Sequence, residues 1–256
     1  MENGAVTDAA YWDTVWGRTR PKRLSSGDPM FGEQGLFLRL VERELGDLRG
    51  ARVLELGAGG TSYRLLALAL WAGADVSGID YSAVGLEVVS NVFARHGAAL
   101  RLFHGDFFEH DLDGGRFDVV VHWGVLEHFM DPRPLLATSE ARLSAGGRTL
   151  FTMPNMQAFA AQLWRRYCPE NWSRHVFHTD AAIAAACGAS KLHLKRTFHT
   201  GTPLLLMKDF ERGSARMGHL LAQGQRLIEW STPLLPRLSW ENRWLAKERG
   251  FVAIRP

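Results

Sequence analysis

The chain has 256 residues, 46% of them hydrophobic, and its formal net charge is +3. This length suits one α/β domain that buries a large core, and no apolar run approaches the roughly 18 residues that a membrane-spanning helix needs. Residues 1–8 do not resemble a secretory signal, and Cys168 and Cys187 form neither a metal motif nor a disulfide framework. These features argue against secreted disulfide scaffolds and membrane proteins, and we expect a cytoplasmic location.

The charge is divided unevenly along the chain. Residues 1–155 carry 15 Lys and Arg against 20 Asp and Glu, a balance of −5, whereas residues 156–256 carry 15 against 7, a balance of +8. A basic half can bind nucleic acid or an acidic ligand, but these basic residues are scattered, as on an ordinary solvated face. We therefore predict no nucleic-acid partner, no membrane partner, and a monomer or a homodimer.

Residues 1–50 are predicted to form a helical cap. A first helix over 9–16 carries Tyr11, Trp12 and Trp16. These aromatic residues either close over a ligand or dock the helix on the core, because exposed aromatic patches need a purpose. A second helix is predicted to begin at Asp28–Pro29 and to end near residue 46, since apolar residues recur there with a period of 3.6.

Residues 51–154 alternate strand and helix patterns and are predicted to form the core of the same single domain. Near-continuous apolar strands with helices between them indicate a parallel sheet covered on both faces. Such sheets bind ligands at the carboxyl ends of their strands. The predicted strands span 52–56, 75–79, 100–104, 117–122 and 147–153, with a turn at 144–147 before the fifth.

Residues 155–256 are predicted to add a lid, two edge strands and a helical insertion. In the lid, one helical face carries Phe159, Leu163, Trp164 and Tyr167. Thr179 is predicted to cap a short helix after the lid. The edge strands are expected over 191–198 and 251–255, with the insertion at 201–247 between them.

A glycine turn directly after the first predicted strand is the most informative motif. Gly57 and Gly59 have no Cβ, and the order strand, glycine turn, helix lets backbone N–H groups approach a ligand closely. Glu55 stands just before the turn, where a carboxylate would repel a pyrophosphate but attract a cationic amino-acid end. Ser62 replaces the third glycine of a dinucleotide fingerprint. The turn therefore favours a nucleoside ligand with positive charge over NAD.

Three further segments follow at fitting intervals. Asp80 ends the second strand 23 residues after Gly57, where an acid accepts the hydroxyl groups of a ribose. Asp106-Phe107 follows the third strand, and the segment 122–128, His-Trp-Gly-Val-Leu-Glu-His, follows the fourth. Together with the glycine turn, these segments resemble the four motifs of the class I S-adenosylmethionine (SAM) methyltransferases, in their small-molecule branch. Thr61 departs from a glycine that the family often has, and its hydroxyl is expected to cap the next helix.

The resemblance implies a Rossmann-like α/β fold, in which a seven-stranded, mostly parallel sheet has helices on both faces, a helical lid and an antiparallel pair at one edge. It implies SAM as the cofactor and a small, fairly hydrophobic acceptor. The cofactor-binding residues that it implies are Glu55, Gly57, Ala58, Gly59, Thr61, Asp80, Tyr81, Asp106, Phe107, His122, Trp123 and Gly124. The acceptor-binding residues are Tyr11, Trp12, Trp16, Trp164 and Trp172.

A general base is needed only if the acceptor keeps its proton at neutral pH. Histidine suits that role, and we expect His128 first and His175 second, although a structural role remains the alternative for each. The favoured function is O-methylation with such a base. N- or C-methylation by positioning alone and an NAD-dependent oxidoreductase are the alternatives. No metal is predicted, because Asp131 and Asn155 are the only loose candidates for ligands.

Overall fold

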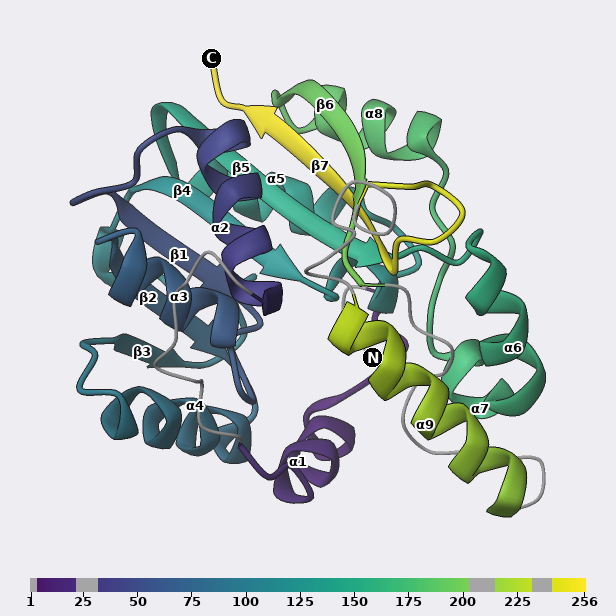
Figure 1. Ribbon diagram of the computed structural model, residues 1–256. Helices are drawn as coiled ribbons and strands as arrows, with labels where there is room; N and C mark the ends of the chain where they lie inside the picture. The colour runs from purple at the N-terminus through teal and green to yellow at the C-terminus, as the bar shows by residue number, and fades with distance from the viewer. Residues whose placement is uncertain (1–3, 22–31, 203–214, 232–240) are drawn as a thin grey trace.

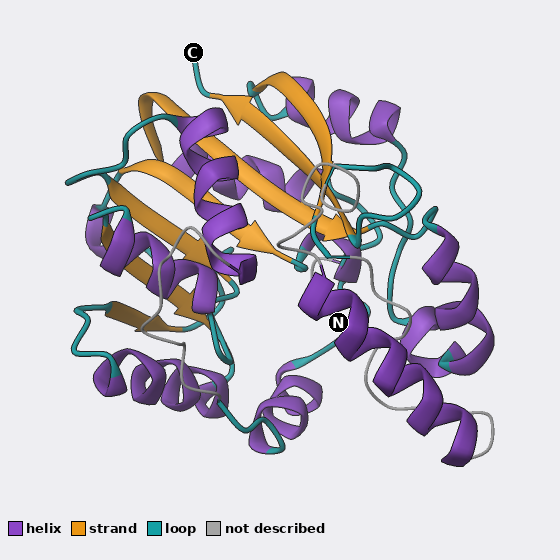
Figure 2. Cartoon of the chain, viewed as in Figure 1, coloured by secondary structure: helices purple, strands orange, loops and turns teal. Residues whose placement is uncertain are grey.

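The computed structural model describes residues 4–21, 32–202, 215–231 and 241–256. Its centre is a seven-stranded sheet with the order β3-β2-β1-β4-β5-β7-β6 (Figures 1 and 2). Strands β1 to β5 pair in parallel, whereas β7 runs antiparallel to both β5 and β6. The predicted Rossmann-like fold, with its antiparallel edge pair, is therefore confirmed. The strands are β1 (Arg52–Leu56), β2 (Asp75–Asp80), β3 (Arg101–His104), β4 (Phe117–Trp123), β5 (Leu143–Pro154), β6 (His193–Thr200) and β7 (Glu248–Ile254).

The fifth strand begins earlier than predicted. The expected turn at 144–147 is wrong, because these residues belong to β5. They form a bulge: Leu143 pairs with Phe117, and pairing resumes between Arg148 and Val119. The extra residues of a bulge oppose a shorter stretch of the partner strand, so a local glycine pattern reads as a turn although the strand continues.

The helices cover both faces of the sheet or lie beyond it. They are α1 (Ala9–Gly17), α2 (Gly32–Leu45), α3 (Tyr63–Trp71), α4 (Ala83–Arg95), α5 (Arg133–Arg142), α6 (Phe159–Tyr167), α7 (Pro169–Ser173), α8 (Asp180–Ala189) and α9 (Ala215–Ser231). Thr179 caps α8 as predicted, since its side chain accepts from the Ala182 N–H. The predicted cap by Thr61 is wrong: the N-cap of α3 is Ser62, which has φ 34° and makes no side-chain cap. The predicted start at Asp28–Pro29 lies outside the described residues.

Side chains alternate along each strand between two hydrophobic clusters. On one face, Val53, Val119 and Val121 pack against α2, α3 and α4. On the other face, Leu54, Val120 and neighbouring residues pack against α5 and α8. This two-sided burial explains why the strands read as almost continuous apolar runs. It also decides on which side each polar residue of β4 lies.

The lid helices lie beside the carboxyl ends of the strands. Figure 1 shows α1, α6 and α7 away from the two helix layers. In α6, Trp164 is buried, whereas Phe159 is 66% exposed and stacks on Trp244. No helix in the described part of the chain combines the length and the apolar character needed to cross a bilayer.

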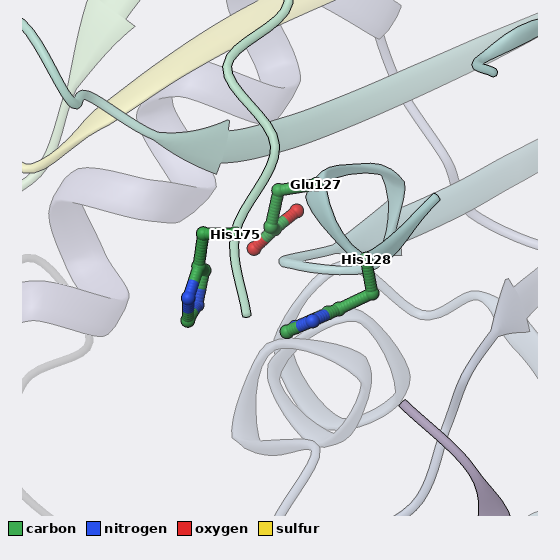
Figure 3. Close-up of side chains that lie close together, drawn as sticks. All are labelled: Glu127, His128 and His175. Carbon is green, nitrogen blue, oxygen red and sulfur yellow. The ribbon is translucent and has the colours of Figure 1, made fainter. Parts of the chain in front are cut away.

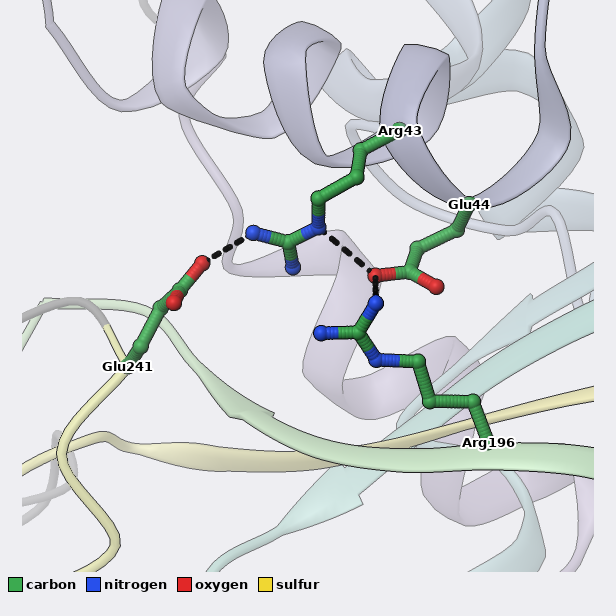
Figure 4. A network of polar contacts seen from close by, with 4 residues as sticks. All are labelled: Arg43, Glu44, Arg196 and Glu241. Atoms are coloured by element: carbon green, nitrogen blue, oxygen red, sulfur yellow. Dashed lines mark hydrogen bonds and ion pairs between the residues drawn. The ribbon is translucent and has the colours of Figure 1, made fainter.

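A polar network on the surface joins α2 to the C-terminal part of the chain (Figure 4). Arg43 pairs with Glu44 and Glu241, and Glu44 also pairs with Arg196 of β6. Because Arg43, Arg196 and Glu241 are largely exposed, these pairs contribute little stability. The pair between Arg43 and Glu241 does connect α2 to the segment that precedes β7.

Candidate active site

A cavity of about 560 Å³ lies at the carboxyl ends of β1, β2, β4 and β5. The order of the sheet reverses at β1 and β4, which is where ligands of open α/β sheets bind. The wall includes many of the residues predicted from the sequence: Glu55, Gly57, Gly59, Thr61, Asp80, Tyr81, Phe107, Trp123, Gly124, Trp12, Trp16, Trp164, His128 and His175. The residues predicted to bind the cofactor and those predicted to bind the acceptor thus line one cavity.

The amide groups of the glycine turn are already engaged inside the protein. The N–H groups of Gly57 and Ala58 donate to the carbonyl of Ile79, and that of Gly60 donates to the carbonyl of Gly85. The Gly59 N–H donates to Asp80 Oδ2 over 2.8 Å. A pyrophosphate needs such donors for itself, so the turn is not a phosphate cradle. The expectation that its N–H groups approach a ligand is corrected.

The missing Cβ atoms of the turn instead let other side chains of the protein pack closely against its backbone. A Cβ on Gly59 would lie 2.7 Å from Asp80 Oδ2 and 2.9 Å from Trp16 Nε1. Gly57 has φ 73°, and a Cβ there would lie 2.8 Å from a methyl group of Val125. All three distances are shorter than real Cβ contacts, so these positions favour glycine.

Glu55 is a buried acid at the end of β1. It is 3% exposed, and its Oε2 has no hydrogen-bond partner. Burial raises the pKa of Glu55 to about 8, although Ser62, the charge of Arg64, and the nearby Trp123 indole lower it. An unpaired, buried carboxyl oxygen is costly, and a cationic ligand group would satisfy it.

Asp80 lies at the end of β2 and organises the turn. Its Oδ2 accepts from Gly59 N, and its Oδ1 accepts from Ser82 N over 2.7 Å. Burial raises its pKa above the usual range, against the effect of these two backbone hydrogen bonds. Each carboxylate oxygen has two lone pairs, so Asp80 can still accept from hydroxyl groups. Tyr81 and Phe107 continue the wall beside it.

Helix α1 reaches both ends of the cavity. Trp12 and Trp16 stack with ring centroids 5.3 Å apart. Trp16 lies over the glycine turn, and Trp12 makes an edge contact with His128, with centroids 5.1 Å apart. The helix is fixed to the core because Ser82 Oγ donates to Asp13 Oδ1 over 2.6 Å.

Two histidines from distant segments meet at the other end. His128 follows β4 and His175 follows α7, and their ring centroids lie 4.8 Å apart (Figure 3). Trp164 packs edge-on against His175, also with centroids 4.8 Å apart. The lid is tied to the loop after β4, since the Val176 N–H donates to the Glu127 carbonyl over 2.7 Å.

Backbone carbonyl groups fix the tautomer of both histidines. Nδ1 of His128 lies 3.0 Å from the carbonyl oxygen of Arg174, and Nδ1 of His175 lies 2.7 Å from that of Asn171. A carbonyl only accepts, so each neutral ring carries its proton on Nδ1 and its lone pair on Nε2. Burial lowers the pKa of His128 to about 3 and also lowers the pKa of His175. Both rings are therefore neutral proton acceptors at neutral pH.

Glu127 joins the two histidines and was missed from the sequence. It is 2% exposed, its Oε2 has no partner, and burial raises its pKa to about 8. Among the described residues, Glu127, His128 and His175 form one group that could hold a metal ion, because their potential metal-binding atoms lie within 4.8 Å of one another (Figure 3). The candidates considered from the sequence do not belong to this group: Asn155 lines the cavity but donates to two carbonyls of the 241–247 segment, and Asp131 pairs with Arg133. The absence of a metal remains a prediction.

Five predicted residues do not reach the cavity. His122 is the clearest correction: it is fully buried on the α5–α8 face of β4, where its ring stacks on Phe151. The side chains of Val121 and Trp123 point to the opposite face, so alternation turns His122 away from the cofactor side. The other four are also absent from the lining and make contacts with neighbouring residues instead. Ala58 packs against Gly78, Asp106 accepts from Phe108 N, Tyr11 lies under Arg174, and Trp172 packs on Trp164.

The ubiquinone biosynthesis O-methyltransferase of Aromatoleum aromaticum is 31% identical over 146 residues, which cover 57% of each chain. The chain thus matches little more than half the length of this curated relative. Magnesium protoporphyrin IX methyltransferase of Synechocystis, solved with bound S-adenosylhomocysteine, has a TM-score of 0.55 at 17% identity over 87% of this chain and 80% of its own.

The fold also serves other chemistry. The [4+2]-cyclase SpnF superposes with a TM-score of 0.62 at 14% identity, covering 97% of this chain and 94% of its own. Likeness at this level shows the fold alone. A family profile described as a methyltransferase domain matches residues 31–190, which is more than half of the chain. The chain therefore belongs to the methyltransferase domain family, and its resemblance to the class I SAM-dependent methyltransferases is confirmed.

Proposed function

We propose that the chain transfers the methyl group of SAM to a hydroxyl oxygen of a small, largely apolar acceptor. The observation that carries this proposal is the pair of neutral histidines in the cavity wall, His128 and His175, whose Nδ1 protons are held by backbone carbonyl groups. A hydroxyl acceptor must lose a proton, and Nε2 of either ring can take it. The O-methyltransferase name of the Aromatoleum aromaticum relative supports oxygen as the acceptor atom.

The cavity fits the cofactor in three respects. Glu55 supplies a buried oxygen without a partner for a cationic group, and Asp80 retains lone pairs for ribose hydroxyls. The bare Cα of Gly59 lets its N–H approach Asp80 Oδ2 to 2.8 Å, and this contact holds the Asp80 carboxylate in the cavity wall. The engaged amides of the turn offer nothing to a pyrophosphate, which argues against the NAD alternative together with the family match.

SAM, when bound, supplies a methyl group that is already activated by the sulfonium. The chain therefore has to position the acceptor, exclude water and receive one proton. Helix α1 covers the glycine turn with Trp16 and contacts His128 with Trp12, so one element closes over both ends of the cavity. His128 or His175 takes the proton at Nε2. Trp164 supplies an apolar surface beside His175.

N- or C-methylation by positioning alone is the second candidate. The observation that favours it is the strong burial of His128, which lowers its pKa to about 3 and makes it a weak base in the empty site. A bound acceptor changes these surroundings. The two candidates therefore differ in whether turnover needs an imidazole.

Matched acceptors separate the two. A series of 4-alkylphenols and the corresponding 4-alkylanilines would be incubated with isotopically labelled SAM, and the products analysed by mass spectrometry. We expect labelled methyl ethers from the phenols and strongly reduced ether formation in His128→Ala and His175→Ala. Methylation of the anilines alone, or undiminished ether formation in both variants, would contradict the proposal.

A further inference from the structure

A small group of charged residues interrupts the aromatic wall of the cavity. Arg64 is the second residue of α3, one turn beyond the glycine turn, and it lines the cavity together with Glu55, Lys247 and Glu248. Its Nη2 donates to Glu248 Oε1 over 2.7 Å, and its Nη1 lies 3.3 Å from Thr152 Oγ1. The sequence motifs did not mark Arg64, because its neighbours come from β5 and β7.

Two aromatic rings hold the guanidinium in place. The centre of the Arg64 guanidinium lies 5.2 Å from the ring centroid of Phe37 and 5.0 Å from that of Trp123. The Arg64 side chain is 18% exposed. Contacts from α2, β4 and β7 thus converge on one side chain, which keeps its fork in a fixed orientation before any ligand arrives.

Two cationic side chains, Arg64 and Lys247, lie in this part of the wall. Glu248 lies between them, 4.0 Å from Lys247 Nζ. Burial raises the pKa of Glu248, but Arg64 and Lys247 outweigh this effect and lower it, so Glu248 is ionised. Glu55 is neutral in the empty site at pH 7, because burial raises its pKa to about 8.

A zwitterionic ligand fits this arrangement. The amino-acid end of SAM carries an ammonium and a carboxylate on one carbon. The unpartnered Oε2 of Glu55 suits the ammonium. Arg64 lies near enough that its positive charge lowers the pKa of Glu55. Guanidinium groups bind carboxylates through charge-assisted hydrogen bonds.

We propose that Arg64 binds the carboxylate of the cofactor's amino-acid end and makes the site select nucleosides with an intact amino acid. This inference rests on the use of SAM in the proposed function but is independent of the acceptor. Arg64 acts as a positioning residue, since fixing the carboxylate fixes the sulfur that precedes it along the ligand. Glu248 and the two rings hold Arg64 in the orientation that this role needs.

Three ligands test the assignment by calorimetry. S-adenosylhomocysteine carries both charged groups, S-adenosyl-3-thiopropylamine lacks only the carboxylate, and 5′-methylthioadenosine lacks the whole amino-acid end. Loss of a hydrogen-bonded charge pair corresponds to roughly a 10- to 100-fold change in affinity. We expect Arg64→Met to weaken the binding of S-adenosylhomocysteine by about this factor and to leave the affinities for the other two ligands unchanged. Arg64→Lys keeps the positive charge, so it should lose less affinity for S-adenosylhomocysteine than Arg64→Met.

Matched variants exclude a merely structural effect. Arg133→Met removes another paired arginine from an exposed position and should change no affinity. Glu55→Gln should weaken the binding of the two ligands that carry the ammonium, S-adenosylhomocysteine and S-adenosyl-3-thiopropylamine. An equal loss for all three ligands in Arg64→Met, or no loss for any, would overturn the role of Arg64.

The wild-type protein gives a result even if Arg64→Met does not fold. S-adenosylhomocysteine should bind at least about tenfold more tightly than S-adenosyl-3-thiopropylamine. Equal affinities would sink the inference while leaving the proposed function intact. Failure of all three nucleosides to bind would instead overturn the proposed function.

Discussion

The two ends of the cavity respond to burial in opposite ways. At the cofactor end, burial raises the pKa of Glu55 to about 8 and also raises that of Asp80. At the acceptor end, burial lowers the pKa of His128 to about 3 and also lowers that of His175. Both ends therefore favour neutral groups when no ligand is present. At the cofactor end a cationic ligand would restore the charge of Glu55, whereas at the acceptor end the neutral ring is the form that the proposed proton transfer requires.

The ends also differ in how the chain assembles them. Glu55, Gly59 and Asp80 lie within one β-α-β unit, whose turn geometry fixes them locally. His128 and His175 come from separate segments and meet only because the lid segment pairs with the loop after β4. Changes at the acceptor end should therefore affect turnover, and changes at the cofactor end should affect binding.

The largest expected effect is at the histidine pair. His128→Ala combined with His175→Ala should lower O-methyl transfer by about 10²- to 10⁴-fold, the usual contribution of a general base. S-adenosylhomocysteine affinity should stay close to that of the wild type, since neither ring contacts the glycine turn. Steady-state kinetics and calorimetry check the two parts, with the exposed His193→Ala as the control. Retained turnover would remove the base from the mechanism.

Asp80→Ala should show the opposite pattern. Loss of its hydrogen bonds to ribose hydroxyls should cost about 1–3 kcal/mol of cofactor binding. Part of that loss comes from the Gly59 and Ser82 N–H groups that Asp80 now satisfies. Titration with S-adenosylhomocysteine measures the change, and Asp75→Ala at the exposed start of β2 is the matched control. An unchanged dissociation constant would refute the role of Asp80.

Glu55 predicts a pH dependence of binding. Its pKa in the empty site is about 8, and an ammonium ligand favours the carboxylate, so binding below pH 8 releases one proton. The affinity for S-adenosylhomocysteine should therefore fall by about tenfold per pH unit as the pH decreases below 8. It should level off above pH 8. In Glu55→Gln this slope should disappear, and a slope that persists there would assign the proton to another group.

His122 should matter for stability but not for the site. Its folded pKa is about 3, below the usual 6.5, because burial disfavours the charged ring. The unfolded chain then binds more protons than the folded chain. As the pH decreases from about 6.5 to about 3, His122 therefore lowers the free energy of unfolding, by at most about 1.4 kcal/mol per pH unit. His122→Phe should reduce this loss in urea unfolding and leave cofactor affinity unchanged. A weaker cofactor affinity in this variant would restore His122 to the site.

The sequence predicted what depends on local pattern. Strand periodicity located β1 to β4 to within a few residues, and the turn after β1 located Glu55 and Asp80. Alternation along β4 could have separated His122 from Trp123, had both faces of the sheet been considered. Arg64 and Glu127 carry no local signal, since their roles depend on β7 and on the lid. The internal bonding of the turn amides likewise depends on Ile79 and Gly85, which no motif marks.

The most direct test of the cavity's assignment is calorimetric titration of the wild-type protein with S-adenosylhomocysteine and, separately, with NAD. The unpaired Glu55 oxygen and the engaged amides of the glycine turn predict saturable binding of S-adenosylhomocysteine and no binding of NAD. Binding of NAD without binding of S-adenosylhomocysteine would contradict both the cofactor and the methyl transfer proposed here.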